Sequence, residues 1–142
     1  FYIINRLGSG DAGLGAADYD FPFGDPGDQP VVVDLDGDGI DTVGIYRPSN
    51  GLVSFSYGTT PPFSYGAAGD RAVFGTWEGG EVDTAGVFRE RSGMFYLRSS
   101  NTTGAADHSF NYGAPGFAPV AGFFGELPGG SDPPSPSFCP AS

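Results

Sequence analysis

The sequence predicts an all-β protein built from two to three imperfect antiparallel β repeats of roughly 42–47 residues. Its composition is one observation behind this prediction, because 25 glycines, 13 prolines and 15% aromatic residues are typical of short strands separated by tight turns. A second observation is an internal repeat. A third is a series of four- or five-residue apolar runs bounded by glycine-containing turns.

The internal repeat centres on a motif of Asp, Thr, any residue, Gly, an apolar residue, an aromatic residue and Arg. It reads Asp41-Thr-Val-Gly-Ile-Tyr-Arg47 and returns 42 positions later as Asp83-Thr-Ala-Gly-Val-Phe-Arg89. A third, partial copy begins at Met94. We therefore expect one β-repeat domain over residues 1–125, with repeats at about 1–51, 52–93 and 94–125.

The elements follow from this pattern in chain order. The N-terminal segment Phe1-Tyr-Ile-Ile4 resembles Phe95-Tyr-Leu-Arg98 of the third copy, and we expect a strand there. Residues 42–46 and 52–57 read as two strands, and Arg47-Pro-Ser-Asn-Gly51 between them has the residues of a tight hairpin turn. Arg89-Glu-Arg-Ser-Gly93 forms the corresponding turn of the second copy. Residues 126–142 read as a Pro/Gly/Ser-rich tail or linker.

The unit has the size of a propeller blade. Propellers typically close with four to eight blades, so about two and a half units are too few to close a ring alone. The predicted fold is therefore propeller-blade-like with open sheet edges, and an open edge can recruit a further strand.

Charge and residue usage exclude several classes of function. The net charge is −11, which disfavours nucleic acid and anionic membranes and favours cations. Cys139 and His108 are the only cysteine and histidine, so the chain can form neither an intrachain disulfide nor a cysteine-histidine zinc site. We expect no transmembrane segment, because no apolar run approaches the length of one. No catalytic set is assembled, and we expect that the chain is not an enzyme.

The sharpest motif is the loop Asp34-Leu-Asp36-Gly-Asp38-Gly-Ile-Asp41. Carboxylates at loop positions one, three and five can converge on a hard cation, and the glycine at position six permits the sharp turn. The backbone carbonyl of Ile40 and the side chain of Asp41 are candidates to complete the shell. A solvated acidic turn is the alternative, but a bound divalent cation offsets the repulsion among four carboxylates. The sequence therefore predicts a Ca²⁺ site.

The stretch Val33-Asp-Leu-Asp-Gly-Asp-Gly-Ile-Asp-Thr-Val-Gly-Ile-Tyr-Arg47 resembles the FG-GAP or VCBS repeats, the calcium-binding blades of integrin-α-type propellers that also occur in bacterial extracellular proteins. The resemblance covers residues 1 to about 125 as decaying copies. It implies Asp34, Asp36, Asp38 and the Ile40 carbonyl as ligands. Thr42 stands where the family has its usual Asp, and Asp41 lies one place earlier.

The second copy has a poorer set of potential ligands. Its residues equivalent to the calcium loop are Thr76, Glu78, Gly80 and Asp83, so one side-chain ligand is missing and another is altered. We expect one strong metal site, with the second weak or empty.

Two further features have both a functional and an ordinary interpretation. Asn101-Thr-Thr103 satisfies the glycosylation sequon, and an ordinary polar turn explains it equally well. Five aromatic residues could form a platform that stacks on sugars, although sheet packing explains most of them. They are Phe55, Tyr57, Trp77, Phe95 and Tyr96.

These features predict an extracellular or cell-surface protein with a structural or adhesive role. We expect it to be stabilised by calcium and to self-associate through its open sheet edges into a filament or surface layer. A carbohydrate-binding module of a secreted multidomain protein is the alternative.

Overall fold

The computed structural model describes residues 1–3, 17–77 and 79–121. Within them the chain forms strands and turns and no helix, so the all-β prediction is confirmed. The strands are β1 (Tyr2–Ile3), β2 (Tyr19–Asp20), β3 (Gln29–Val33), β4 (Thr42–Arg47), β5 (Leu52–Phe55), β6 (Phe63–Ser64), β7 (Arg71–Gly75), β8 (Thr84–Arg89), β9 (Met94–Leu97) and β10 (His108–Asn111). No helix of the described residues is long and apolar enough to cross a membrane.

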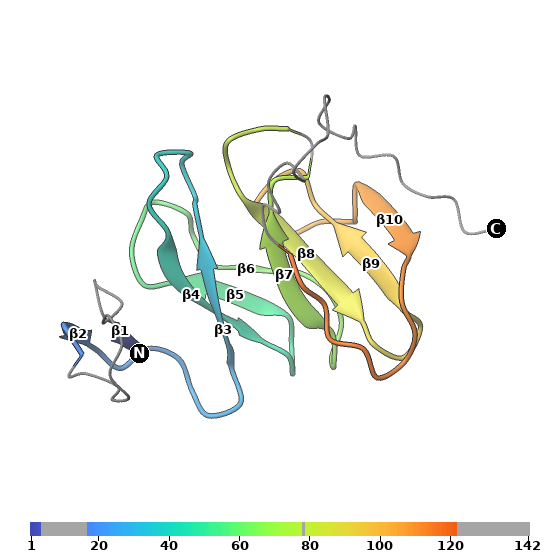
Figure 1. The fold of residues 1–142 in the computed structure, drawn as a ribbon, viewed down its shortest axis with the longest axis horizontal. Coiled ribbons are helices and arrows are strands. Elements are labelled where there is room, and N and C mark those ends of the chain that lie inside the picture. Colours follow the sequence, from blue (N-terminus) through green and yellow to red (C-terminus); the bar gives the residue numbers. More distant parts are fainter. Residues whose placement is uncertain (4–16, 78, 122–142) are drawn as a thin grey trace, which may run out of the picture.

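The strands form three antiparallel sheets, none of which closes into a barrel. One sheet has the order β3-β4-β5-β6, a second has the order β10-β9-β8-β7, and β1 pairs with β2 in a small two-stranded sheet. The two large sheets stand side by side with β3 next to β7, while β1-β2 lies apart at the other end of the molecule from β9 and β10 (Figure 1). The arrangement is open and propeller-blade-like.

The two large sheets repeat one another in register. In the first, Gly44 lies opposite Phe55 and Arg47 opposite Leu52. In the second, Gly86 lies opposite Leu97 and Arg89 opposite Met94. The predicted boundaries after residues 51 and 93 fall in the β4-β5 and β8-β9 turns, so the sheets are half a unit out of phase with the predicted repeats. The residues of a turn predict where one strand ends and the next begins. They do not predict which strands belong to the same sheet.

The glycine of the repeated motif is explained by the space around it. A Cβ atom at Gly44 would lie 2.6 Å from Phe55 Cδ1, and one at Gly86 would lie 2.6 Å from Leu97 Cδ2. Both distances are shorter than carbon atoms tolerate. The glycine therefore makes room for a large side chain on the neighbouring strand.

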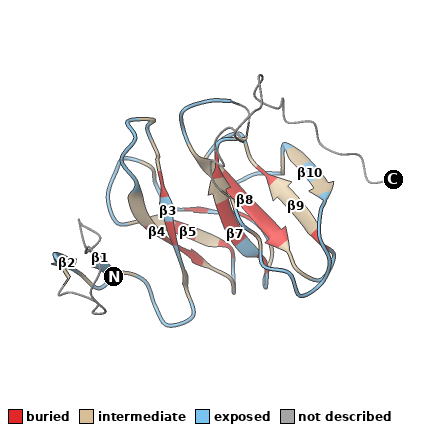
Figure 2. Cartoon of the chain, in the orientation of Figure 1, coloured by how far each residue is buried: buried red, intermediate tan, exposed pale blue. Residues whose placement is uncertain are grey.

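The core lies within the two large sheets and between them (Figure 2). In β3, Val31 and Val33 are buried whereas Val32 is 60% exposed, which is the alternation expected of a strand with one solvated face. The central strands β4 and β8 contribute the completely buried Tyr46 and Phe88. Burial raises the pKa of the Tyr46 hydroxyl to about 12.

Each large sheet has an Arg-Asp ion pair at the equivalent position, between the last residue of its second strand and an aspartate just before its first strand. Arg47 donates to both carboxylate oxygens of Asp28 at 2.8 and 2.7 Å, and Arg89 donates to both oxygens of Asp70 at 2.9 and 2.8 Å. The hydrogen bonds from Arg47 lower the pKa of Asp28 to about 2, although burial opposes the shift. Asp70 is only 1% exposed, so its pair is shielded from solvent.

Candidate metal centre

The acidic loop connects β3 to β4 and begins directly after the buried Val33. Gly37 and Gly39 have φ angles of 79° and 81°, a region that glycine adopts at little cost. These two positions let the loop fold back on itself after each of the middle aspartates. The sequence pattern of alternating Asp and Gly therefore produces a compact loop at the end of the first sheet.

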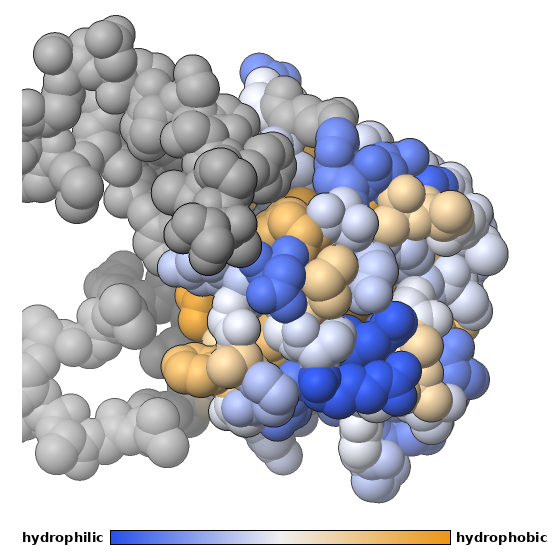
Figure 3. Space-filling model, turned by 90° about the vertical axis from the view of Figure 1, so that its right-hand side faces the viewer, coloured by the Kyte–Doolittle hydropathy of each residue, from blue (hydrophilic) through white to orange (hydrophobic). Residues whose placement is uncertain are grey.

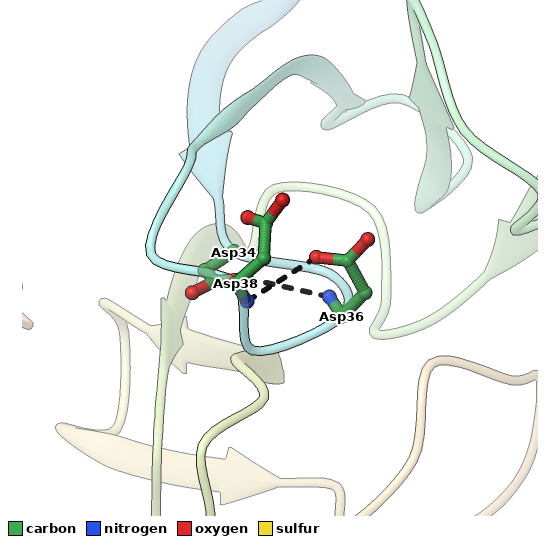
Figure 4. A group of neighbouring side chains, drawn as sticks. All are labelled: Asp34, Asp36 and Asp38. Carbon is green, nitrogen blue, oxygen red and sulfur yellow. Dashed lines mark hydrogen bonds between the residues drawn. The ribbon is translucent and has the colours of Figure 1, made fainter.

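The carboxylate of Asp34 organises this loop by accepting hydrogen bonds from backbone N–H groups of later loop residues. Its Oδ1 accepts hydrogen bonds from the N–H of Asp36 at 3.3 Å and of Gly37 at 2.7 Å, and its Oδ2 accepts one from Gly39 at 2.9 Å. Asp36 accepts a bond from the N–H of Asp38 at 3.4 Å, and Figure 4 draws this bond together with the one between Asp36 and Asp34. Asp38 in turn accepts one from the N–H of Ile40 at 2.8 Å. Hydrogen bonds from backbone N–H groups to the three aspartates thus shape the loop.

The three aspartates gather at one point. Asp34, Asp36 and Asp38 each present a carboxylate oxygen within 4.8 Å of the others, with Asp34 half-buried and the other two exposed. Burial alone would raise the pKa of Asp34, but its hydrogen bonds from backbone N–H groups outweigh that effect and lower the pKa. A cluster of carboxylates at this separation fits a hard cation such as Ca²⁺ or Mg²⁺, both of which prefer oxygen ligands.

The remaining predicted ligands lie beside this cluster. Ile40 is 71% exposed and Asp41 is exposed, and Asp41 is not one of the three gathered carboxylates. Their participation stays a prediction.

The loop is fastened to the second sheet by Asp83, the second-copy counterpart of Asp41. The N–H of Asp83 donates to the carbonyl of Asp34 at 2.8 Å, and the N–H of Asp34 donates back to Asp83 Oδ2 at 3.2 Å. The other oxygen of Asp83 accepts a bond from the Thr76 hydroxyl at 3.1 Å. The Asp83 carboxylate therefore joins the two sheets. No second carboxylate cluster of the metal-binding kind occurs in the described part of the chain.

The sequence reasoning missed this joining role, and it also missed that of Gln29. Gln29 donates from Nε2 to the carbonyl of Ala72 at 2.9 Å and accepts from the N–H of Ala72 at 3.1 Å. Its side-chain amide thus makes with β7 the pair of hydrogen bonds that the backbone of a neighbouring strand would make. A glutamine at the start of a strand gives no sequence signal for such a contact, because the partner lies on another sheet.

Asn101 of the sequon is held at the end of the second sheet. Its Nδ2 donates to the carbonyl of Asp83 at 2.9 Å, and its Oδ1 accepts from the N–H of Ala85 at 3.1 Å. The nitrogen to which a glycan would be attached is therefore engaged in a structural hydrogen bond. Glu78 and Cys139 lie outside the described residues.

Two aromatic residues of the predicted platform are engaged in ring packing. Phe55 packs edge-on against Phe74 at 6.2 Å, and Phe95 stacks on Phe110 at 5.2 Å. Tyr57 is 84% exposed, away from these contacts. Trp77 is half-buried and lines an open cleft of about 570 Å³ between the two large sheets, together with Leu35 of the acidic loop.

The surface that faces away from β1 and β2 carries hydrophilic residues over much of its area, with smaller hydrophobic patches among them (Figure 3). Fold and site together define an open, propeller-blade-like all-β protein with a surface carboxylate loop that could hold a metal ion. No family model matches the chain, and no curated protein or solved structure is detectably similar to it.

Proposed function

We propose that this chain is an extracellular structural module that binds Ca²⁺ in the loop of residues 34–41 and self-associates through its open sheet edges. The observation that carries the proposal is the convergence of Asp34, Asp36 and Asp38 within 4.8 Å. The resemblance of this loop to FG-GAP and VCBS repeats supports calcium as the ion.

The exposure of the loop supports an extracellular setting. Asp36 and Asp38 are exposed, and a site of this kind holds calcium weakly because several of its ligands must be water. Calcium sites of extracellular modules have dissociation constants on the order of 10⁻⁴ to 10⁻³ M. Such a site is filled where calcium is abundant.

Calcium binding would act on the junction between the sheets. Asp34 contributes a carboxylate to the cluster and two backbone hydrogen bonds to Asp83. An ion that fixes Asp34 therefore also fixes the contact between the first and second sheets. The binding energy is expected to appear as resistance of that junction to unfolding.

Open edges support self-association. In the described residues β1, β2, β6 and β10 each pair with only one strand, whereas the edge strands β3 and β7 lie beside each other and are joined by the Gln29 side chain. An unpaired edge is a template for a strand of another chain. The net charge of −11 opposes association between copies, and bound or screening calcium reduces that repulsion.

Sedimentation velocity at several protein concentrations tests this proposal. We expect assembly to increase with calcium and to be reversed by a chelator, and sodium chloride at the same ionic strength serves as the control for screening. The double variant Asp36→Asn and Asp38→Asn keeps the size of the side chains and removes two charges. A chain that stays monomeric under all of these conditions would refute the self-association part, and unchanged calcium binding in the double variant would refute the site.

Carbohydrate binding is a second candidate function, favoured by the cleft beside Trp77. The cleft is also lined by Glu81 and Asn101, so it combines an aromatic surface with polar groups. Titration with soluble polysaccharides, followed by the fluorescence of the only tryptophan, tests it. A Trp77 signal that no polysaccharide changes would remove this candidate.

A further inference from the structure

The loop between β3 and β4 contains two dipeptides that are chemically unstable in proteins. Asp36-Gly37 and Asp38-Gly39 are the only two Asp-Gly pairs of the sequence. Glycine has no Cβ atom, so its backbone nitrogen can come close to the side-chain carboxyl group of the aspartate before it. Both aspartates are exposed to solvent. Their sequence and exposure make Asp36 and Asp38 candidates for spontaneous conversion to isoaspartate.

This conversion is an internal rearrangement that needs no cofactor and no oxidant. The nitrogen of Gly37 attacks Cγ of Asp36, and the new C–N bond closes a succinimide ring. The proton of that nitrogen leaves with the hydroxyl of the protonated carboxyl group as water. Water then adds to the backbone carbonyl carbon of Asp36 and breaks the original peptide C–N bond. The chain afterwards runs through Cβ and Cγ, and the carboxylate stands directly on Cα. The same steps apply to Asp38 and Gly39.

The carboxylate of Asp34 holds both of the nitrogens that would have to attack. The N–H of Gly37 donates to Asp34 Oδ1 at 2.7 Å, and the N–H of Gly39 donates to Asp34 Oδ2 at 2.9 Å. Each oxygen of one carboxylate thus engages the nitrogen of one Asp-Gly pair. Such a nitrogen keeps its proton, and it cannot turn toward the preceding side chain without breaking a charge-assisted hydrogen bond.

The carboxyl groups that would be attacked are also engaged. Asp36 accepts from the N–H of Asp38 at 3.4 Å, and Asp38 accepts from the N–H of Ile40 at 2.8 Å. Each carboxylate is therefore bonded to the residue two positions later. In both Asp-Gly pairs the nitrogen and the carboxyl group have separate partners, so the reaction requires the loop to open first.

We propose that Asp36 and Asp38 are sites of isoaspartate formation and that the carboxylate of Asp34 protects both of them in the folded loop. The reaction begins when the hydrogen bonds from Gly37 and Gly39 to Asp34 open. The product has one additional backbone atom at each converted residue, and its carboxylate is displaced. The gathering of the three carboxylates is then lost permanently, because refolding does not reverse a covalent change. This inference requires no bound ion and goes beyond the proposed function.

The chain contains an internal reference for the same chemistry. Asn50-Gly51 is the only Asn-Gly pair, and it lies in the turn between β4 and β5. Asparagine forms the same ring, with ammonia as the leaving group. The N–H of Gly51 donates to the carbonyl of Arg47 at 2.8 Å, so its protection does not depend on Asp34. Deamidation of Asn50 therefore reports opening of the first sheet rather than of the acidic loop.

Incubation of the full chain with a chelator, at one pH and below the unfolding temperature, tests the proposal. Peptide mapping with electron-transfer fragmentation measures isoaspartate at each position over time. We expect Asp34→Ala to raise the rates at Asp36 and Asp38 at least about tenfold, because hydrogen bonds to a charged acceptor no longer have to open first. Asp41→Ala is the matched control, since it removes a charge from the same loop and Asp41 is not the acceptor of either glycine bond. We expect its rates to stay within about twofold of those of the parent chain.

The reference pair and a peptide make the test independent of how the variants fold. Equal rates in Asp34→Ala and Asp41→Ala would overturn the proposal. An equal rise of Asn50 deamidation in Asp34→Ala would also overturn it, because the protection would then come from the sheet as a whole. A synthetic peptide of residues 33–42 is expected to form isoaspartate at both positions at least about tenfold faster than the parent chain. A parent chain that reacts as fast as this peptide would show that the folded loop gives no protection.

Discussion

Asp70→Asn is expected to destabilise the protein by about 3 kcal/mol, because it leaves the half-buried guanidinium of Arg89 without its counter-charge. Asp70 is 1% exposed and accepts three hydrogen bonds, from Arg89 Nε at 2.9 Å, from Arg89 NH2 at 2.8 Å and from the N–H of Ala67 at 2.9 Å. The variant keeps the shape of the side chain and can still accept from Ala67. What it loses is the charge and part of the bidentate contact with Arg89.

The geometry around Arg89 sets the size of the effect. Its side chain is 23% exposed and also lies over the ring of Tyr96 at 4.6 Å, so solvent can replace Asp70 only in part. Removing one member of a buried ion pair costs about 3–5 kcal/mol, and the partial exposure of Arg89 places the expected value at the lower end. The midpoint of thermal unfolding should fall by about 10 °C or more.

Urea unfolding monitored by the fluorescence of Trp77 measures this loss, because Trp77 lies two residues after the end of β7 and Asp70 immediately before its start. Asp25→Asn is the matched control. Asp25 also contacts an arginine, Arg47, but its side chain is 71% exposed, so we expect a change below about 0.5 kcal/mol. If Asp70→Asn shifts the midpoint no more than Asp25→Asn does, the ion pair between Asp70 and Arg89 does not stabilise the second sheet.

Three further predictions concern calcium, pH and assembly. Calcium at 100 times its dissociation constant should raise the free energy of unfolding by about 2.7 kcal/mol, and Asp36→Ala should abolish most of this increase in a calcium titration of the melting temperature. The pKa of Asp28 falls from 3.8 in the unfolded chain to about 2 in the folded one, so its ion pair with Arg47 contributes stability above pH 3.8 that is lost as the pH falls toward 2. Asp28→Asn should therefore flatten the curve of stability against pH between these two values. An unchanged slope would show that the ion pair of Asp28 is not the cause. Deletion of residues 1–5 should give a chain that no longer associates, measured by sedimentation at matched calcium; an unchanged sedimentation coefficient would show that association does not need the N-terminal strand.

The sequence was sufficient for the fold class and for the strands around the repeated motif. The predicted strand at residues 42–46 corresponds to β4, and the turn at Arg47-Pro-Ser-Asn-Gly51 joins it to β5 as expected. Local signals carry this information, because apolar runs and turn residues act on their immediate neighbours. The grouping of strands into sheets depends on contacts between distant residues, and the repeat boundaries after residues 51 and 93 do not mark it, since each large sheet takes strands from two neighbouring repeats.

The candidate site could likewise be predicted in its local part and not in its contacts with distant residues. The alternation of Asp and Gly predicted the gathering of Asp34, Asp36 and Asp38, because it is a property of one short loop. The attachment of that loop to Asp83 could not be predicted, since the two residues are 49 positions apart. The ion pairs of Asp28 and Asp70 did leave a signal: both aspartates lie 19 residues before their arginines, and the two pairs are 42 positions apart.

Because each large sheet spans a boundary between sequence repeats, the number of sheets can change by duplication of a whole repeat. Each large sheet takes its first two strands from one sequence repeat and its last two from the next, with the repeat boundary in the turn between them. Duplication of residues 52–93 in tandem would therefore add one whole four-stranded sheet and leave every existing hairpin intact, although the inserted segment begins and ends in the middle of a sheet. Array length in this architecture can change by recombination within an exposed turn, without a new junction in the core.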